Sequence, residues 1–576
     1  MKKRLQQAVA AFFAIALILQ GSVLAQQTRQ SQSPVGSTAG KPATGAPAAG
    51  RRSRRSDSKT VAPVVDDFEE ALRLVQDNYI EGRKLDYNSV FKSSITGMLR
   101  SLDPHSNYYD KEEFDELKTD QRSEYYGIGA SIQSYAVGED TDTFITAAFD
   151  NSPAARAGLR FADRIVAVDS VKMTGKASID VRDKIRGPRG SMVKITLERA
   201  ADKRMETVQI TRDAVPQPSI PDSYMLKPGV GYVDMTRGFN YSTTEELQGA
   251  MDDLHAKGMT SLVLDLRNNP GGFLDQAIHV AELFLPNGQL ILTQKGRNAY
   301  RDNDEHRSRN SSPDMTPLVI LVNEYTASAS EIVAGAMQDH DRALIVGKTS
   351  FGKGLVQRII PLEYGAGLTL TSAKYYTPSG RLIQRDYSNG GFYDYYTHGG
   401  STKLDQKEQA KPSGPEKKTD TGRAVYGGGG IAPDEDIEAR TVSLYQRRLL
   451  SPIFLFARDV ANGRIAGFDN YKVQRPIEFT HALQPTDFAI TDPLFKSFKD
   501  YVVSQPELKM TVAQLDHSRA FIALQLRFNL VTAAYGRVMA ERVLVTTDDP
   551  QVAKAVAVLP RARNLAMSST GARSQR

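Results

Sequence analysis

The sequence predicts an α/β protein whose parallel sheet carries helices on both faces, preceded by a β-rich module and followed by a mostly helical region. Between residues 228 and 385, continuous apolar runs alternate with helical patterns, which is typical of a buried parallel sheet. Residues 125–212 hold short strand-like runs separated by turn residues. From about residue 441 to 545, the apolar residues follow mostly helical spacing. A chain of 576 residues has room for all three regions.

The N-terminus is organised like a secretory signal peptide. Basic residues at positions 2–4 precede an apolar run over residues 8–19, and Ala25 ends a small-residue cleavage site. The run is short for a bilayer span. We therefore expect cleavage after Ala25 and a periplasmic or otherwise extracytoplasmic location, with an uncleaved membrane anchor as the alternative. No cysteine follows the run, which excludes a lipoprotein anchor.

Composition excludes several classes of function. Residues 1–60 hold ten Lys or Arg and one acidic residue, so the net charge of +6 leaves about −3 for the rest of the chain. A chain without a basic folded surface is not expected to bind nucleic acid. The absence of cysteine excludes disulfides and a thiol nucleophile. The eight histidines form no metal-binding motif, so we expect neither a metal nor a cofactor.

Changes in composition and periodicity divide the chain into seven segments. Polar, Gly-rich and Pro-rich stretches predict a linker and a mobile insertion. The predicted segments are a signal peptide (1–25), a disordered linker (26–63), a helical segment (64–122), the β-rich module (123–213), the α/β core (214–440, with a mobile insertion at 387–422), a helical region (441–546) and a mostly disordered tail (547–576).

The individual elements follow from local periodicity. Phe68, Leu72, Val75 and Tyr79 lie on one face of a predicted helix. A second helix over 90–99 ends at a turn-rich break at 101–106, and a third covers 177–185 within the β-rich module. The expected strands of that module are 144–148, 164–168, 193–197 and 208–211. In the core, the expected strands are 262–266, 318–322 and 343–346, and the expected helices are 273–285 and 331–337.

Two loops of the core each join a strand to a helix, where α/β folds place their sites. Residues 267–272 end in Gly271 and Gly272, which let unpaired backbone N–H groups approach a ligand and stabilise an oxyanion. An ordinary Gly-rich turn is the alternative for this loop. Residues 326–331 contain two serines at a helix start, where one cap suffices. Ser330 is the better cap, which leaves the hydroxyl of Ser328 near the positive helix end.

A third loop, residues 349–354, follows the strand at 343–346 and contains Lys353 between two glycines. Lysine is usually a solvated surface charge, but burial can lower its pKa enough for the amine to act as a base. A neutral amine can take the proton of a serine hydroxyl, as a histidine would. Gln357, four residues further on, is placed to orient the amine. His340 ends the helix that Ser328 begins, so we disfavour a histidine base.

Three motifs in these loops resemble those of the carboxyl-terminal processing (tail-specific) proteases in residue identity, order and spacing. The motifs are Leu-Asp-Leu-Arg-Asn-Asn-Pro-Gly-Gly at 264–272, Ser-Ala-Ser-Glu-Ile at 328–332 with Ala-Gly-Ala-Met-Gln-Asp at 334–339, and Phe-Gly-Lys-Gly at 351–354 with Val-Gln at 356–357. The resemblance covers roughly residues 65–385 and resumes at 427–434. It implies a crotonase-like or ClpP-like α/β core with an inserted PDZ domain.

The resemblance also implies roles for single residues. Ser328 corresponds to the nucleophile and Lys353 to the general base of a Ser–Lys dyad. Gln357 would orient Lys353. The oxyanion hole would consist of the N–H of Ala329 and that of Gly271 or Gly272. Lys348 is the rival lysine, but it lacks the Phe-Gly-Lys-Gly context.

The β-rich module resembles a PDZ domain. Its residues Tyr126, Gly127, Ile128, Gly129 and Ala130 are similar to the loop that holds a chain-terminal carboxylate through successive N–H groups. The segments 152–159 and 163–165 also match PDZ usage. Arg186 corresponds to an arginine that senses bound peptide in some relatives, and a purely structural arginine is an equal alternative.

The predicted function is therefore that of an exported serine endopeptidase that captures the C-terminus of a protein substrate and cleaves it through an acyl-enzyme. A crotonase-like acyl-CoA enzyme is one alternative, but it needs no PDZ module or signal peptide. A non-catalytic PDZ scaffold is the other, but it needs neither Ser328 nor Lys353. The helical region at 441–546 is extra to the simplest family members. We expect it to serve a homodimer contact, docking of an adaptor protein or shielding of the site.

Overall fold

The computed structural model describes residues 58–120, 124–138, 140–388, 395–396, 414–473 and 476–574. The predicted signal peptide, most of the predicted linker and most of the predicted insertion at 387–422 lie outside these residues. Within the described ranges, no helix combines the length and the apolar character that a membrane span requires.

The α/β core is built on a sheet whose described strands follow the order β10-β11-β12-β15-β16-β21. Neighbouring strands from β11 to β21 pair in parallel, whereas β10 pairs antiparallel with β11. This arrangement confirms the predicted parallel sheet. The strands are β10 (Asp222–Lys227), β11 (Val230–Asp234), β12 (Ser261–Asp265), β15 (Leu318–Val322), β16 (Ala343–Gly347) and β21 (Glu435–Asp436).

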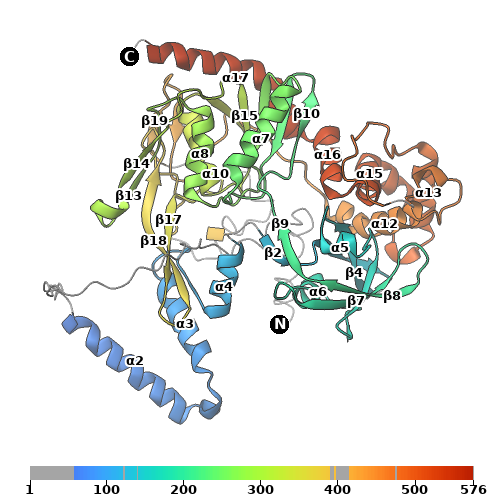
Figure 1. Ribbon diagram of the computed structural model, residues 1–576, viewed down its shortest axis with the longest axis horizontal. Helices are drawn as coiled ribbons and strands as arrows, with labels where there is room; N and C mark the ends of the chain where they lie inside the picture. The colour runs from blue at the N-terminus through green and yellow to red at the C-terminus, as the bar shows by residue number, and fades with distance from the viewer. Residues whose placement is uncertain are drawn as a thin grey trace, which may run out of the picture.

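Both faces of this sheet are covered by helices, as the continuous apolar strands predict. Leu264 and Ile320 pack toward α7 (Thr243–Ala256), α8 (Leu274–Phe284) and α10 (Ala329–Asp339). Val263 and Val319, one residue earlier on the same strands, pack on the opposite face against α17 (Pro550–Ser574), because successive side chains alternate across a strand. Figure 1 shows α17 in red across this face.

The helix α17 differs from the prediction of a mostly disordered tail over 547–576. Its apolar side chains are spread around the helix without a strong amphipathic pattern, so local periodicity gives little sign of the helix. Contact with the sheet nevertheless buries one side of the helix. The side chains that α17 buries there are Val552, Ala555, Val558, Leu559 and Ala562.

A second sheet lies beside the core sheet. Its strands follow the order β1-β18-β13-β14, and β17 pairs with β18. The strand β1 comes from the N-terminal segment, so this sheet joins that segment to the core. The elements are β1 (Asn107–Tyr109), β13 (Leu290–Gly296), α9 (Ala299–Asp302), β14 (Asp304–Arg307), β17 (Leu355–Pro361) and β18 (Gly367–Tyr376), followed by the separate hairpin β19 (Glu416–Lys418) and β20 (Ala424–Tyr426).

The β-rich module forms a sheet in the order β3-β4-β5-β7-β8, with the short β6 beside β5 and a separate β2–β9 pair. All four expected strands and the expected helix are present. The strand β3 lies at the edge of the sheet. The elements are β2 (Glu124–Gly127), β3 (Ala130–Val137), β4 (Asp140–Ala148), α5 (Pro153–Arg156), β5 (Arg164–Val168), β6 (Val171–Lys172), α6 (Ser178–Ile185), β7 (Met192–Glu198), β8 (Met205–Thr211) and β9 (Asp213–Pro216).

The N-terminal helices extend away from the core at the lower left of Figure 1. The helix α2 exposes much of its predicted apolar face, with Phe68 48% and Tyr79 55% exposed. The elements are α2 (Ser58–Asn78), η1 (Gly82–Lys84), α3 (Tyr87–Arg100) and α4 (Lys111–Asp120).

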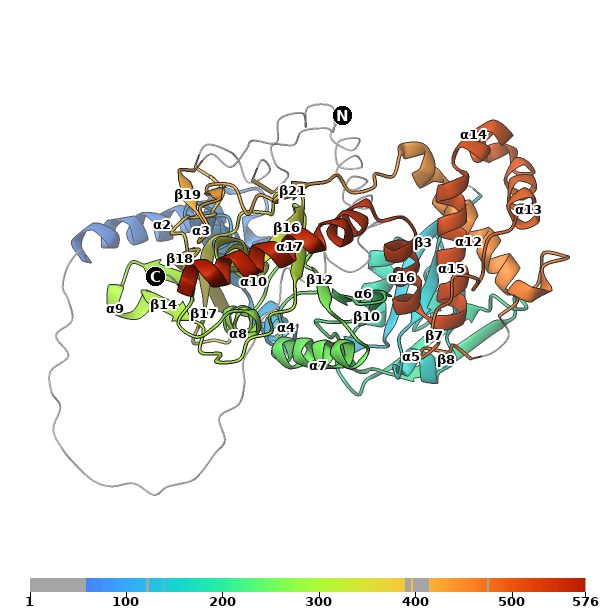
Figure 2. The same ribbon diagram turned by 90° about the horizontal axis from the view of Figure 1, so that it is seen from above.

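The C-terminal helical region packs on the β-rich module, and the two lie side by side in Figures 1 and 2. The ring of Phe454 stacks on Tyr135 of β3 at a centroid distance of 3.8 Å and meets Phe144 and Phe161 edge-on. Sequence patterns predicted this region but not its partner. Its elements are α12 (Leu444–Ala461), η3 (Asp469–Tyr471), α13 (Asp492–Val503), η4 (Pro506–Leu508), α14 (Val512–His517), α15 (Arg519–Tyr535) and α16 (Arg537–Asp548).

Candidate active site

Ser328 occupies a strained position between β15 and α10. Its φ is +57°, a left-handed value that a non-glycine residue seldom adopts and that often marks a functional site. The residue takes the N-cap position of α10, yet its side chain makes no capping hydrogen bond. The predicted cap, Ser330, instead donates to the carbonyl of Asn269 at 3.1 Å. The hydroxyl of Ser328 is thus unused by the helix, although Ser330 is not the cap.

The carboxylate of Glu331 joins the serine loop to the lysine loop. Its Oε1 accepts hydrogen bonds from Ser350 Oγ at 2.5 Å and Gly352 N at 2.7 Å. Its Oε2 accepts from Ser328 N and Lys353 N, both at 2.8 Å. Burial raises the pKa of Glu331, and these hydrogen bonds oppose the shift. The only sequence signal for this role of Glu331 is the Ser-x-x-Glu spacing of a capping box, which does not point to a link with the lysine loop.

Tyr375, on β18, ties the same two loops together from another side. Its buried hydroxyl lies 3.0 Å from the carbonyl oxygen of Ser328 and 2.7 Å from that of Lys353. The backbones of both residues are therefore fixed relative to each other by two independent side chains, Glu331 and Tyr375.

Lys353 has the electrostatic character expected of a base. Burial lowers its pKa to about 8, although the negative charges of Glu331 and Asp103 act in the opposite direction. Within the described part of the chain, its Nζ makes no ion pair, and no hydrogen bond joins it to Ser328 Oγ. Catalytic hydrogen bonds are often long in enzymes without substrate. The structure places the two residues in adjacent loops of one site.

The other candidates for the base lie in unsuitable places. Lys348 Nζ is 2.7 Å from carboxylate oxygens of both Asp436 and Glu438. Burial would lower the pKa of Lys348, but these hydrogen bonds raise it above its usual value. His340 caps the far end of α10, about 18 Å along the helix from Ser328.

Gln357 does not contact Lys353 through a hydrogen bond in the described structure. Its Nε2 donates to Thr371 Oγ1 on β18 at 3.3 Å. The predicted orienting role of Gln357 therefore stays a prediction.

The glycine loop lies directly against Ser328. Gly271 has a φ of +94°, and a Cβ there would lie 2.7 Å from Ser328 Cβ, so no larger residue fits. The N–H of Gly271 is already bonded to Asn269 Oδ1 at 2.9 Å. By contrast, the N–H groups of Gly272 and Ala329 have no acceptor among the described residues. This favours Gly272 over Gly271 as the partner of Ala329 in an oxyanion hole.

A buried ion-pair network holds the start of the glycine loop. Arg267 donates to both carboxylate oxygens of Asp265, while its Nη1 lies 2.7 Å from Asp549 Oδ2 and 3.0 Å from Gln551 Oε1. The hydroxyl of Tyr232 donates to Asp265 at 2.7 Å. The first residues of α17 are thus linked to the loop that contains Gly271 and Gly272.

The turn at 101–106, expected only as a break between helices, lies beside Lys353. The charge of Asp103 acts on the Lys353 amine, and burial together with Lys353 lowers the pKa of His105 to about 2. The ring of His105 lies 6.5 Å from that of Phe351. No sequence pattern connects this turn to Lys353, because the contact is purely tertiary.

The predicted carboxylate-binding loop joins β2 to β3. Within the described part of the chain, no acceptor is bonded to the N–H groups of Ile128 and Gly129. A Cβ on Gly129, whose φ is +72°, would lie 2.3 Å from Ser152 Cβ. Tyr126 and Gly127 end β2, and Ala130 begins the edge strand β3. Arg186 lies half-buried at the end of α6, and its role stays a prediction.

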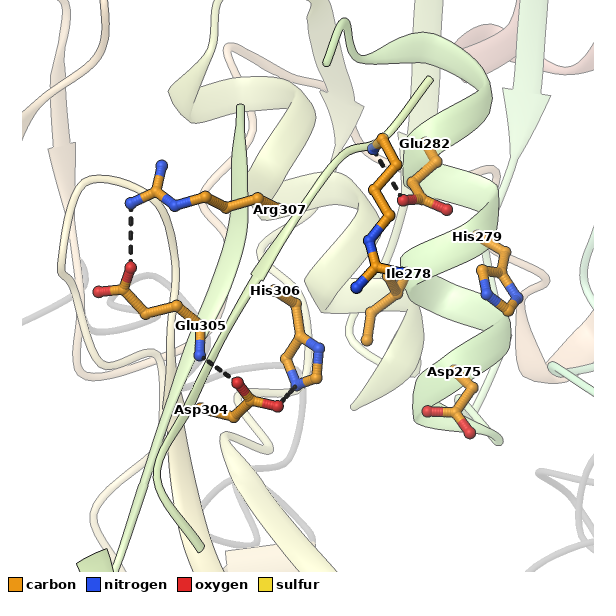
Figure 3. A pocket seen from close by; sticks show the side chains of 9 residues that line it. Asp275, Ile278, His279, Glu282, Asp304, Glu305, His306 and Arg307 are labelled. Atoms are coloured by element: carbon orange, nitrogen blue, oxygen red, sulfur yellow. Dashed lines mark hydrogen bonds and ion pairs between the residues drawn. The ribbon is translucent and has the colours of Figure 1, made fainter. Parts of the chain in front are cut away.

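A separate hollow of about 630 Å³, open to solvent, lies between α8 and β14 (Figure 3). Neither Ser328 nor Lys353 lines it. Over the ranges that the structure describes, no cluster of His, Asp or Glu is arranged to hold a metal ion. The residues that line this hollow are Asp275, Ile278, His279, Glu282, Asp304, Glu305, His306, Arg307 and Arg309.

Comparisons with known proteins match two regions of the chain to known families. Peptidase family S41 matches residues 229–390, and the PDZ domain matches residues 144–199. A carboxy-terminal-processing protease of Bartonella bacilliformis is 39% identical over 306 residues, which are 52% of this chain and 68% of that protein. A probable CtpA-like serine protease of Staphylococcus haemolyticus is 34% identical over 55% of this chain and 62% of its own length.

Among solved structures, the photosystem II D1 C-terminal processing protease is 27% identical, with 64% of this chain and 92% of that chain covered at a TM-score of 0.34. Fold, site and matches together define a serine-type endopeptidase with a PDZ domain. The chain belongs to the carboxy-terminal-processing protease family.

Proposed function

We propose that this protein is an exported endopeptidase that recognises the C-terminus of a protein substrate and cleaves the chain with Ser328 as nucleophile and Lys353 as general base. The observation that carries the proposal is the joining of the two loops by Glu331, which accepts hydrogen bonds from the backbones of both residues. A spare hydroxyl and a buried amine are thereby held in one site.

In the acylation step, the neutral amine of Lys353 takes the proton of Ser328 Oγ while the oxygen attacks the peptide carbonyl. The carbonyl oxygen becomes an oxyanion, which accepts hydrogen bonds from the N–H groups of Ala329 and Gly272. Removing one such donor typically costs about 10²–10³-fold in kcat. The protonated amine then gives its proton to the leaving nitrogen, and the C–N bond breaks.

In the deacylation step, Lys353 acts as base toward water. The amine takes a proton from the water molecule as its oxygen attacks the Ser328 ester. Collapse of the second tetrahedral intermediate breaks the bond to Oγ, and the proton returns from the amine to Ser328. The products are two peptides, and the enzyme regains its starting protonation state.

Recognition of the substrate is assigned to the PDZ domain. The N–H groups of Ile128 and Gly129 suit a terminal carboxylate, which such loops bind through successive backbone donors. The edge strand β3 follows directly and offers its backbone to the residues before the carboxylate.

The test uses an unstructured protein substrate with a free C-terminus and the same substrate with its C-terminus amidated. We expect the wild type to cleave the free form with a higher kcat/KM, and Ser328→Ala to cleave neither. Intact-mass measurement of the wild type under rapid quenching should show a covalent peptide adduct that Ser328→Ala lacks. Equal cleavage of the two substrates contradicts recognition of the C-terminus, and an active Ser328→Ala contradicts the nucleophile.

Export is a separate part of the proposal, and it rests on the basic and apolar pattern of residues 2–25. We expect the mature protein to begin after Ala25 and to be found outside the cytoplasm. N-terminal sequencing of the protein from fractionated cells measures both, and a cytoplasmic protein that keeps residue 2 contradicts export.

A further inference from the structure

The turn that follows α3 is built as a rigid unit beside Lys353. Asp103 Oδ1 accepts hydrogen bonds from the N–H of His105 at 2.8 Å and of Ser106 at 2.9 Å, and its Oδ2 accepts from Ser106 Oγ at 2.7 Å. Ser106 Oγ accepts from Thr371 N on β18 at 3.1 Å. The orientation of His105 is therefore set by the turn and by β18.

The side chain of Tyr395 packs onto this turn and onto the lysine loop together. Its ring lies 5.4 Å from that of His105 and 5.6 Å from that of Phe351, edge-on in both cases. Its hydroxyl lies 2.7 Å from His105 Nε2. Since the pKa of His105 is far below neutrality, the imidazole is neutral, and a hydrogen bond joins its Nε2 to the tyrosine hydroxyl.

A second set of contacts reaches the other side of Lys353. Gln384 Nε2 donates to the Tyr395 hydroxyl at 3.1 Å, and its Oε1 accepts from Gly354 N at 2.8 Å. Tyr395 is thus tied to Phe351 before Lys353 and to Gly354 after it. Tyr395 itself is only 4% exposed. The neighbouring Tyr396 donates its hydroxyl to the carbonyl of Pro104 at 2.5 Å, which fastens the turn.

The charged groups around Lys353 do not explain the lowered pKa of its amine. Glu331 from α10 and Asp103 from the turn both favour the protonated amine. The neighbouring phenols of Tyr375 and Tyr395 remain protonated, because burial raises the pKa of each. Arg385 packs its guanidinium over the face of Phe351 at 5.0 Å, so the ring lies against that cation. Exclusion of water is therefore the main influence that lowers the pKa of the amine to about 8.

We propose that Tyr395 is a positioning residue that closes the water-excluding wall around Lys353 through its contacts with His105 and Phe351. The inference rests on the proposed role of Lys353 as general base. It assigns part of the catalytic environment to the 387–422 insertion, which sequence analysis treated as a mobile addition.

The first test measures the pH dependence of kcat/KM for Tyr395→Ala. Removing the ring admits water to Lys353, so the pH at which activity appears should rise by at least one unit. The rate at pH 7 should fall at least tenfold and recover toward the wild-type rate near pH 10. A loss of equal size at every pH indicates a merely structural role and overturns the inference. Tyr364→Ala, at a tyrosine that is 88% exposed, is the matched control.

A second readout does not depend on activity. In the Ser328→Ala background, the rate of amine acylation at Lys353 is followed against pH by mass spectrometry, with and without Tyr395→Ala. We expect titration near pH 8 with the tyrosine and closer to 10.5 without it. Titration near 10.5 in both proteins contradicts the proposed base itself. Titration near 8 in both overturns only the role of Tyr395.

Variants that keep the bulk of the side chain guard against misfolding. Tyr395→Leu retains an apolar plug and should keep the wild-type titration of Lys353. Tyr395→Gln places a hydrated group beside Lys353. This variant should raise the pH at which Lys353 titrates, as Tyr395→Ala does. If Lys353 titrates at the same pH in Tyr395→Leu and Tyr395→Gln, the inference is overturned, even where Tyr395→Ala does not fold.

Discussion

Glu331 is the residue on which the geometry of the site depends most. Its carboxylate is fully buried and makes no ion pair at hydrogen-bond distance among the described residues, yet two hydrogen bonds reach each oxygen. Leaving such donors unpaired in the interior costs more than the hydrogen bonds themselves contribute. The carboxylate therefore acts as a spacer of fixed length between the Ser328 loop and the Lys353 loop.

Replacing this carboxylate by the amide of the same size should damage both stability and activity. In Glu331→Gln, the NH₂ group faces N–H donors and cannot accept from them. We expect the free energy of unfolding to fall by about 2–4 kcal/mol, since two buried donors lose their acceptor. Chemical denaturation measures the change, and Glu363→Gln at an exposed position is the control. Equal stability of both variants contradicts the role assigned to Glu331.

The lowered pKa of Lys353 predicts the pH profile of the enzyme. A base must be neutral, so activity should rise with pH through about 8 and be lost as the amine is protonated below that value. The pH dependence of kcat/KM for a substrate without titratable side chains measures the pH at which activity is half-maximal. A half-maximal pH near 6.5, the pKa range of an ordinary histidine, contradicts a lysine base.

At the scale of elements, α17 covers one face of the core sheet and also anchors the glycine loop. The link runs from Asp549 and Gln551 at its start to Arg267, which directly precedes the loop residues 268–272. Because Arg267 is bonded to Asp265 at the end of β12 as well, strand, loop and helix share one buried network.

Breaking this link should reduce catalysis more than substrate binding. Asp549→Ala removes one of the two carboxylates that hold Arg267, so the N–H of Gly272 is placed less accurately. We expect kcat to fall about 10- to 100-fold with little change in KM, while Asp549→Glu restores part of the loss. Steady-state kinetics measure both constants. Arg561→Ala, which breaks the ion pair between Arg561 on the same helix and Glu435 on β21, should leave both constants unchanged.

The elements that could be predicted from the sequence are those with a local signal. The strand–loop–helix units around Gly271 and Ser328 were predicted because buried strands are continuously apolar and the loops contain glycine and serine. The contacts that complete the site have no such signal. His105 and Tyr395 are 290 residues apart, and α17 lacks a strong amphipathic pattern.

At the scale of the molecule, the C-terminal helical region and the PDZ domain share one hydrophobic core. Phe144 and Phe161 of the domain belong to the same buried cluster as Phe454 and Phe498 of the helices. On the other side, Arg542 of α16 forms two hydrogen bonds with Asp222 of β10. The region therefore connects the PDZ domain to the core. A homodimer contact, docking of an adaptor protein or shielding of the site by this helical region stays a prediction.

Truncating the ring at the centre of this shared core should loosen the connection. Phe454→Ala removes the stack on Tyr135 and leaves a cavity, so we expect a loss of about 3–5 kcal/mol in the free energy of unfolding. Denaturant titration measures it, and Leu444→Ala, at a residue of α12 that is 75% exposed, is the control. A loss no larger than that of Leu444→Ala contradicts a shared core.

The most direct test of the central claim compares two lysines in one assay. Single-turnover cleavage of a substrate with a free C-terminus is measured at pH 8–9 for Lys353→Ala and Lys348→Ala. We predict that Lys353→Ala loses at least about 10³-fold of the acylation rate, because removing a catalytic base together with its geometry has effects of 10²–10⁴-fold or more. Lys348, paired with Asp436 and Glu438, should be dispensable for this step. Wild-type acylation by Lys353→Ala would contradict the Ser328–Lys353 mechanism.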